Sequence, residues 1–360
     1  MSIKKTEFKI ELILLICFVF LLMRALPAVN REKTENEDKR IWKASEENTE
    51  QTGGSMLVVE YATGNEGLLA GDRGILIAKP TAAPTPSPFP TYSPTQDEVV
   101  TVADVVGKKY VMEDLQNVTY LKENLYIVNA STKMTEEEFD AEYFIGKDLS
   151  LGEETSEAPQ ILIFHTHASE GFSDSRSGEV SDTVVGVGEL LAKTLREKYG
   201  YQVLHDTTVF DRKNGKDNRN YAYNDALNYL QELLEKNPSI EVVIDLHRDA
   251  GEKRVTTVNG KQTAKVMLFN GLCRNTQGKL THLPNKNLKD NLAFSFQMKL
   301  IGDEMYPGLM NRIFLKDYRY NMHLKERFLL VELGTEKNTV EEAMNAMEPL
   351  ADVLHQVLGG

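Results

Sequence analysis

The pattern of apolar and polar positions changes character along the chain. An uninterrupted apolar run from Leu12 to Met23 follows three early lysines, and the next stretch, to about residue 55, is polar and has no apolar period. Six of the twelve prolines then fall between Pro80 and Pro94. Only after Pro159 do short apolar runs alternate regularly with stretches of helical period. The pattern therefore predicts an ordered domain in the C-terminal part of the chain.

Strands are expected where apolar residues run together, and helices where they recur at helical spacing. The predicted strands are 161–164, 202–205, 240–246, 264–269 and 327–332, and the predicted helices are 184–199, closed by Gly200, 221–236, 290–302 and 340–358. Alternation of this kind predicts an α/β fold, a three-layer domain with a mostly parallel central sheet covered on both faces. Ligands of such sheets gather at the carboxyl ends of the strands.

The first hundred residues predict a membrane-tethered protein. The twelve-residue apolar run alone spans about 18 Å at 1.5 Å per residue, so a spanning helix must extend to about residues 8–29. We expect a membrane anchor or signal-anchor at 1–29, with a cleaved signal as the alternative, and the early lysines keep its amino end cytoplasmic. A disordered stalk and proline-rich linker, 30–98, would then hold the rest of the chain outside the membrane.

Two further regions follow the linker. We expect a small lead-in region at 99–158, where Thr135 and Glu138 have the spacing of a capping box for a short helix. The catalytic domain is expected at 159–360.

Composition narrows the function classes. Hydrophobic residues make up 41% of the chain and charged ones 26%, which is typical of a globular protein. The net charge of -13 opposes binding to nucleic acid. The two cysteines, Cys17 and Cys273, exclude a disulfide scaffold and a multi-cysteine zinc ribbon.

Ionisable side chains gather where predicted strands end. His165, His167 and Glu170 follow the first strand, His247 and Arg248 follow the strand EVVIDL, and Glu332 ends the late strand FLLV. His167 and Glu170 form an H-x-x-E, whose spacing lets both side chains turn toward one ion, and His247 would complete three ligands. Three protein ligands with an open fourth position are the pattern of a catalytic zinc site.

This pattern assigns a role to each residue. A zinc ion at His167, Glu170 and His247 would activate water, and Glu332 would act as the general base. Arg248 is the candidate for pairing with a substrate carboxylate. His165 is a rival ligand or, failing that, a substrate contact or support, and Asp245 or Asp249 could orient His247. Spacing alone is equally compatible with histidines that bond to backbone groups and with a solvated Glu170.

Other chemistries lack their signatures. Ser169 has no G-x-S-x-G around it, which disfavours a serine hydrolase. No P-loop occurs, and GVGELLA at 186–192 lacks the third glycine of a dinucleotide fingerprint.

Taken in order, HTHASEGF, VVIDLHRDA, NLAFSFQMKL and LLVELGTEKNTVEEAMNAMEPLADVL resemble the stage II sporulation protein P family over roughly residues 100–360. The resemblance implies a fold like that of zinc-dependent N-acetylmuramoyl-L-alanine amidases, and cleavage of the amide between glycan and stem peptide in peptidoglycan. It leaves open whether the protein is an endopeptidase as well. It also implies stage II sporulation proteins D and M as partners during engulfment.

Carried over residue by residue, the resemblance places the metal histidines in HTHASE and at His247, and the catalytic glutamate at Glu332. Related amidases often take a glutamate ligand from the start of the first helix, where this chain has Asp182. Glu170 and Asp182 therefore both stay open as ligands, and Glu170 is preferred.

The leading hypothesis is a membrane-anchored zinc amidase that acts on peptidoglycan outside the cytoplasmic membrane. The alternatives are a zinc carboxypeptidase or endopeptidase on the same polymer and a noncatalytic wall-binding scaffold that recruits other hydrolases.

Overall fold

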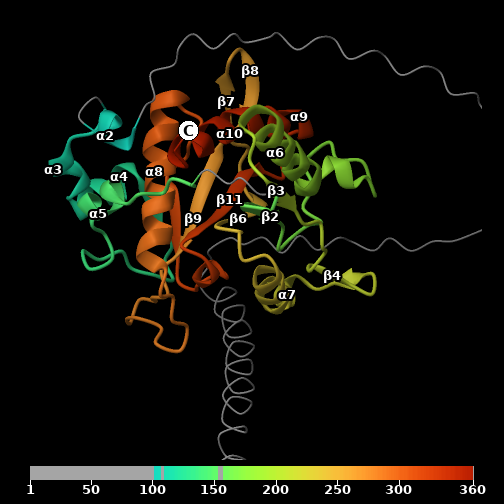
Figure 1. Ribbon diagram of the computed structural model, residues 1–360, viewed down its shortest axis with the longest axis horizontal. Helices are drawn as coiled ribbons and strands as arrows, with labels where there is room; N and C mark the ends of the chain where they lie inside the picture. Colours follow the sequence, from blue (N-terminus) through green and yellow to red (C-terminus); the bar gives the residue numbers. More distant parts are fainter. Residues whose placement is uncertain (1–100, 107–108, 153–156, 360) are drawn as a thin grey trace, which may run out of the picture.

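The computed structural model describes residues 101–106, 109–152 and 157–359 (Figure 1). The predicted anchor, 1–29, and the stalk and linker, 30–98, lie outside these residues. Within the described ranges, no helix combines the length and the apolar character needed to cross a bilayer.

A seven-stranded sheet forms the centre of the fold. All neighbouring strands in it are parallel except β9 and β11, so the predicted mostly parallel sheet is confirmed. Across the sheet the strands are β1 (Tyr126–Val128), β10 (Ile313–Lys316), β9 (Val266–Gly271), β11 (Arg327–Thr335), β6 (Val242–Asp249), β2 (Ile161–Phe164) and β3 (Val203–His205). Two separate hairpins pair β4 (Arg212–Lys213) with β5 (Lys216–Asp217) and β7 (Val255–Val258) with β8 (Lys261–Ala264).

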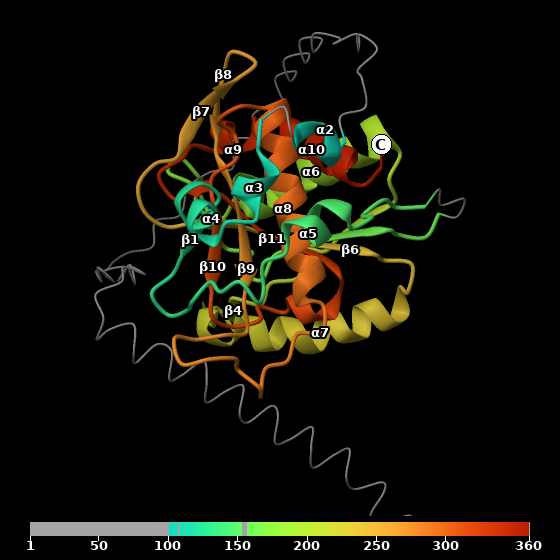
Figure 2. The ribbon, with the colours of Figure 1, turned by 90° about the vertical axis from the view of Figure 1, so that its left-hand side faces the viewer.

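Helices cover both faces of this sheet, as Figures 1 and 2 show from two sides. Residues of β2 alternate between two hydrophobic clusters, because successive side chains of a strand point to opposite faces. Ile161 and Ile163 belong to the cluster formed with α6 (Val184–Tyr199), α8 (Leu288–Met305) and α10 (Met347–Val357). Leu162 and Phe164 belong to the cluster formed with α7 (Ala222–Lys236).

Local signals fix the ends of α6 at the predicted residues. The hydroxyl of Thr183 accepts a hydrogen bond from the amide of Val185, which satisfies one free donor of the first turn. Gly200 ends the helix with a φ of 75°, a left-handed conformation that favours glycine. The helix matches the prediction because both of its caps can be read from the sequence.

The predicted last helix is divided in two. α9 (Val340–Met344) ends before Asn345, and α10 begins at Met347. Pro349 lies in the first turn of α10, where the missing amide hydrogen has no helical partner to lose. A continuous helix would have placed this proline in its interior, so the prediction of one helix is wrong.

The capping box predicted at Thr135 is also wrong, since no helix begins there. The hydroxyl of Thr135 does contact Glu138, but Arg274 draws the same carboxylate into an ion pair. Asp140 caps α5 (Ala141–Gly146) instead. A complete capping box stands at the start of α9, between Thr339 and Glu342.

The lead-in region contributes to the same fold. It contains α2 (Val102–Val105), α3 (Met112–Leu115), α4 (Val118–Asn124) and α5, and its strand β1 pairs with β10 at one edge of the sheet. Phe144 of α5 packs on Phe296 of α8, with ring centroids 5.5 Å apart. Residues before 159 therefore supply a strand and part of the core.

Candidate metal centre

The site lies where β2, β6 and β11 end. These strands run parallel, with Ile161 paired to Val242 and Arg327 paired to the same residue, so their carboxyl ends share one edge of the sheet. Glu332 of β11 pairs directly with His247 of β6. Two of the predicted functional side chains thus start from neighbouring positions on one face.

The H-x-x-E motif is a tight turn. The amide of Glu170 donates to the carbonyl of His167 at 3.1 Å, which closes the turn directly after β2. The amide of Ser169 donates to Asp211 at 3.1 Å, and the amide of Val184 donates to the Glu170 carbonyl at 2.9 Å. These bonds fix the turn against α6 and the loop after β3.

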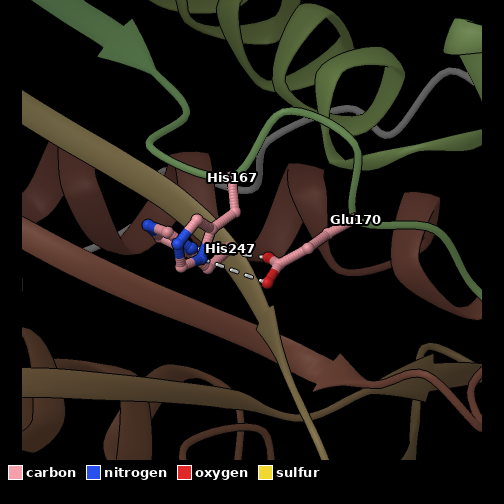
Figure 3. Close-up of side chains that lie close together, drawn as sticks. All are labelled: His167, Glu170 and His247. Carbon is pink, nitrogen blue, oxygen red and sulfur yellow. Dashed lines mark ion pairs between the residues drawn. The ribbon is translucent and has the colours of Figure 1, made fainter. Parts of the chain in front are cut away.

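His167, Glu170 and His247 converge, as Figure 3 shows. One ligand atom from each lies within 4.8 Å of the others. Nδ1 of His167 is 3.4 Å from Oε1 of Glu170, and Nδ1 of His247 is 3.4 Å from Oε2 of Glu170. Ligand atoms of a tetrahedral zinc site with bonds of about 2.1 Å are about 3.4 Å apart, so the two distances between the histidines and Glu170 match such a site.

The charges around Glu170 keep its carboxylate ionised, as a metal ligand must be. Burial favours the neutral carboxyl and would raise the pKa of Glu170, but His167 and His247 outweigh it and hold the pKa well below its usual value. The amide of Arg248 adds a hydrogen bond to Oε2 at 3.0 Å. Glu170 is therefore a buried, ionised carboxylate facing two imidazoles.

Asp245 holds the ring of His247. Its Oδ1 lies 2.8 Å from Nε2 of His247 and forms an ion pair with the ring. Thr166 fixes the carboxylate through its amide at 2.8 Å and its hydroxyl at 2.6 Å. Burial lowers the pKa of His247, yet Asp245 and Glu170 outweigh burial and raise that pKa well above its usual value. The pair leaves Nδ1 turned toward Glu170, the role of a carboxylate behind a metal-binding histidine.

Glu332 has an unsatisfied buried atom. The residue as a whole keeps some exposed surface, but its Oε2 is buried and makes no hydrogen bond with any residue that the structure describes. Burial raises the pKa of Glu332 to about 8, assisted by Asp249 and Glu170. Buried polar atoms normally have partners, so this orphaned oxygen marks a position that expects a proton or a substrate.

His165 lies on the other side of the sheet. β2 ends at Phe164, so the alternation that would place His165 and His167 on one face does not continue. The His165 ring is completely buried beside Gly188 of α6; its Nδ1 donates to the Leu246 carbonyl at 2.8 Å, and its Nε2 is 3.0 Å from His205. His165 thus lies outside the cluster of His167, Glu170 and His247, and its bond to the Leu246 carbonyl gives it the supporting role that was the alternative expectation.

Arg248 has little freedom left. Its Nε donates to the carbonyl of Gly171 at 2.9 Å, and 16% of its side chain is exposed. It fastens the end of β6 to the Glu170 turn, and only its terminal nitrogens remain for a substrate.

The other candidates have different partners. Arg176 forms a two-pronged ion pair with Asp182, with contacts of 2.7 and 2.9 Å, so Asp182 does not join the metal cluster. Asp249 pairs with Arg254 at 2.6 Å, which leaves Asp245 as the support of His247.

Two residues near the centre were missed in the sequence. Arg219 places Nη1 3.4 Å from Oε1 of Glu170. The Tyr223 ring packs edge-on to His167 and parallel to His247, with centroids 5.6 and 6.3 Å away. Both belong to the segment that enters α7, which carries no motif that would connect it with the strand ends.

Two sequence comparisons with known proteins point to the same family. A protein-family profile described as Stage II sporulation protein P matches residues 86–355. Stage II sporulation protein P of Bacillus subtilis (strain 168) is 27% identical over 220 residues; the match covers 56% of this chain and about half, 52%, of that protein.

Solved structures give weaker likenesses. The N-acetylmuramoyl-L-alanine amidase AmiC2 of Nostoc punctiforme is 12% identical, with a TM-score of 0.33 over 57% of this chain and 97% of its own. The amidase Ami1 of Mycobacterium smegmatis is 13% identical, with a TM-score of 0.35 over 57% of this chain and 98% of its own.

Proposed function

The chain belongs to the stage II sporulation protein P family, and from that premise we propose that it is a zinc-dependent N-acetylmuramoyl-L-alanine amidase that cleaves stem peptides from peptidoglycan glycan strands during sporulation. We also propose that the α/β fold of this chain is of the amidase-like type. The single observation that carries the proposed function is the convergence of His167, Glu170 and His247 beside Glu332, whose buried Oε2 has no hydrogen-bond partner in the described part of the chain.

The residues divide the chemical tasks. Zinc held by His167, Glu170 and His247 would lower the pKa of a bound water toward about 7 and polarise the amide carbonyl. Asp245 keeps the His247 ring in the orientation that turns Nδ1 toward Glu170. Arg248 holds the Glu170 turn against the end of β6 through Gly171.

Glu332 moves the proton. It takes a proton from the attacking water and delivers it to the nitrogen of the leaving amine. The buried Oε2 of Glu332, which has no hydrogen-bond partner among the described residues, is the atom that would receive this proton and return it. We expect Glu332→Gln to keep the metal and to lower kcat by about 10²- to 10⁴-fold, the usual contribution of a general acid–base group.

The proposal extends to the location and the partners. We propose a single-pass anchor at 1–29 and a spacer at 30–98 that place the catalytic part outside the cytoplasmic membrane. Peptidoglycan is the substrate, and stage II sporulation proteins D and M are the proposed partners.

Muropeptide analysis of digested cell wall tests the function. Purified wild-type protein and His247→Ala, matched for folding by circular dichroism, are supplied with zinc, and His282→Ala, which changes an exposed loop histidine, is the control. We expect wild type and control to release stem peptides with a free L-alanine amine and His247→Ala to release none.

Other outcomes of the same experiment would support the alternative functions. New amines within the stem peptide would identify a carboxypeptidase or endopeptidase. Equal release by His247→Ala would contradict the assigned site, and wall binding without any release would favour a scaffold.

A further inference from the structure

A second arginine faces the candidate metal centre. Arg219 begins the short 3₁₀ turn η2 (Arg219–Tyr221) that leads into α7. Its Nη1 lies 3.4 Å from Oε1 of Glu170. Because Tyr223, four residues later, packs against the rings of His167 and His247, the same segment supplies both a wall of the site and a guanidinium at its rim.

The guanidinium of Arg219 is less committed than that of Arg248. The Arg219 side chain is 40% exposed, against 16% for Arg248, whose Nε is already bonded to the Gly171 carbonyl. The contact of Arg219 with Glu170, at 3.4 Å, is longer than a normal N–H···O hydrogen bond. Most of the five guanidinium donors of Arg219 therefore remain available to another group.

Glu170 cannot accept hydrogen bonds from all of these guanidinium donors. Its Oε1 also faces Nδ1 of His167 at 3.4 Å, and its Oε2 faces His247 and accepts from the amide of Arg248. The carboxylate is 4% exposed, whereas Arg219 reaches from it into solvent. A planar fork of this kind at the mouth of a site fits a carboxylate in two-pronged fashion.

We propose that Arg219 binds a carboxylate of the substrate and makes the site selective for amide substrates that carry an acidic residue close to the scissile bond. This inference rests on the proposed function, since the stem peptide supplies the carboxylate. Arg219 determines specificity, and Arg248, which was expected to bind the substrate, supports the Glu170 turn.

The test compares two soluble stem-peptide muropeptides that differ at one group, a free carboxylate or a carboxamide on the second residue of the peptide. Zinc-loaded wild type, Arg219→Ala and Arg219→Lys are assayed with both. Arg212→Ala is the matched control, because Arg212 is an exposed arginine of β4 in the same connecting segment.

We expect wild type to prefer the carboxylate substrate by at least about 10-fold in kcat/KM. Arg219→Ala loses about 10- to 100-fold on that substrate, mostly through KM, because one charge-assisted interaction is removed. On the carboxamide it changes little, and Arg219→Lys falls between. Arg212→Ala keeps the wild-type preference. An unchanged preference in Arg219→Ala overturns the inference.

Two readouts besides activity separate the possible failures. Zinc content is measured for every variant, and a fall in kcat on both substrates together with lost zinc would make Arg219 a positioning residue for Glu170 and overturn the inference. Calorimetric binding of the carboxylate and carboxamide peptides to zinc-depleted protein gives the second readout, with a preference expected in wild type and Arg212→Ala and none in Arg219→Ala. If wild type cleaves neither substrate, the proposed function fails, and this binding preference still decides about Arg219.

Discussion

At the metal centre, burial and neighbouring charges have opposite effects on the ionisation of single residues. Burial alone would neutralise both Glu170 and His247, because low-dielectric surroundings disfavour charge. Each nevertheless keeps its charged form, since the carboxylates of Glu170 and Asp245 face the His247 ring and two imidazoles face Glu170. A divalent cation would replace the protons of this cluster, so metal affinity should increase with pH.

His165 and His205 form a buried pair on the α6 side of the sheet. The hydrogen-bond partners of His165 determine which of its ring nitrogens carries the hydrogen. The Leu246 carbonyl only accepts, so Nδ1 of His165 donates to it. Burial lowers the pKa of His165 to about 4, and in the neutral ring Nε2 accepts from His205. His205 in turn places Nδ1 2.8 Å from Oε2 of Glu189. This row of bonds ties the backbone next to His247 to helix α6.

A partly buried histidine outside the centre makes stability depend on pH. Burial lowers the pKa of His323 to about 3, and Nδ1 has no hydrogen-bond partner among the described residues. The unfolded chain binds a proton near pH 6.5, so the folded protein gains stability as pH rises from about 3 to 6.5 and loses it as pH falls. Between pH 7.5 and 5 the loss from this group is about 2 kcal/mol.

Urea unfolding of chelator-treated protein at pH 5 and 7.5 measures this effect. His323→Gln should lose less stability than wild type on acidification, and His282→Gln, at an exposed loop position, should behave as wild type. Equal losses in His323→Gln and wild type would refute the assignment.

The sequence predicted the residues that strand ends bring together. His167, Glu170, His247 and Glu332 each follow an apolar run, so their common edge could be expected before their distances were known. Arg219 could not be found in this way, because it reaches Glu170 from the turn η2, whose position depends on the packing of α7.

At the scale of elements, strand register positions the site. Parallel pairing of β11 with β6 sets Glu332 beside His247, and a shift by one residue would turn Glu332 to the opposite face of the sheet. Helix α6 must also approach closely, because a Cβ on Gly188 would lie 2.7 Å from Cε1 of His165. The absence of a side chain at Gly188 allows α6 to lie over the buried histidine pair.

We expect Gly188→Ala to destabilise the protein by about 1–3 kcal/mol, the usual cost of overpacking. Alanine favours a helix over glycine by about 1 kcal/mol, so propensity alone predicts the opposite sign. Gly146→Ala is the control, because a Cβ on this exposed glycine of α5 meets nothing within 4 Å. Thermal unfolding should show a lower Tm for Gly188→Ala only; a raised Tm would contradict the close approach.

The prediction was best where capping residues identify both ends of a helix. Thr183 and Gly200 delimit α6, and the prediction is confirmed residue for residue. The edge strand β1 and its neighbour β10 were missed, because neither short run stands out from its surroundings as a strand pattern.

At the scale of the whole molecule, the sheet unites distant parts of the chain. β1 pairs with β10, nearly 190 residues later, and strand order of this kind is fixed by packing that no local pattern records. Tyr126 and Phe144 of the lead-in region are fully buried. Each such side chain contributes about 1.5–3 kcal/mol to stability through burial. We therefore propose that residues 101–360 form one folding unit.

Truncation tests this proposal. A fragment of residues 101–360 should unfold in one cooperative transition, whereas a fragment of residues 159–360 should lack fixed tertiary structure, because it exposes the edge of β10 and part of the core. Near-ultraviolet circular dichroism and calorimetry distinguish the two. A fragment of residues 159–360 with the same sharp transition would show that the lead-in is a separate unit.

The assignment of the metal centre is tested most directly by locating zinc in the protein. Crystals of the zinc-loaded chain measured at the zinc absorption edge should show one strong anomalous peak bonded at about 2.0–2.2 Å to nitrogens of His167 and His247 and to an oxygen of Glu170. His282→Ala should keep the peak, and His247→Ala should lose it. A zinc peak held by other residues, or none in protein that still releases stem peptides, would contradict the account.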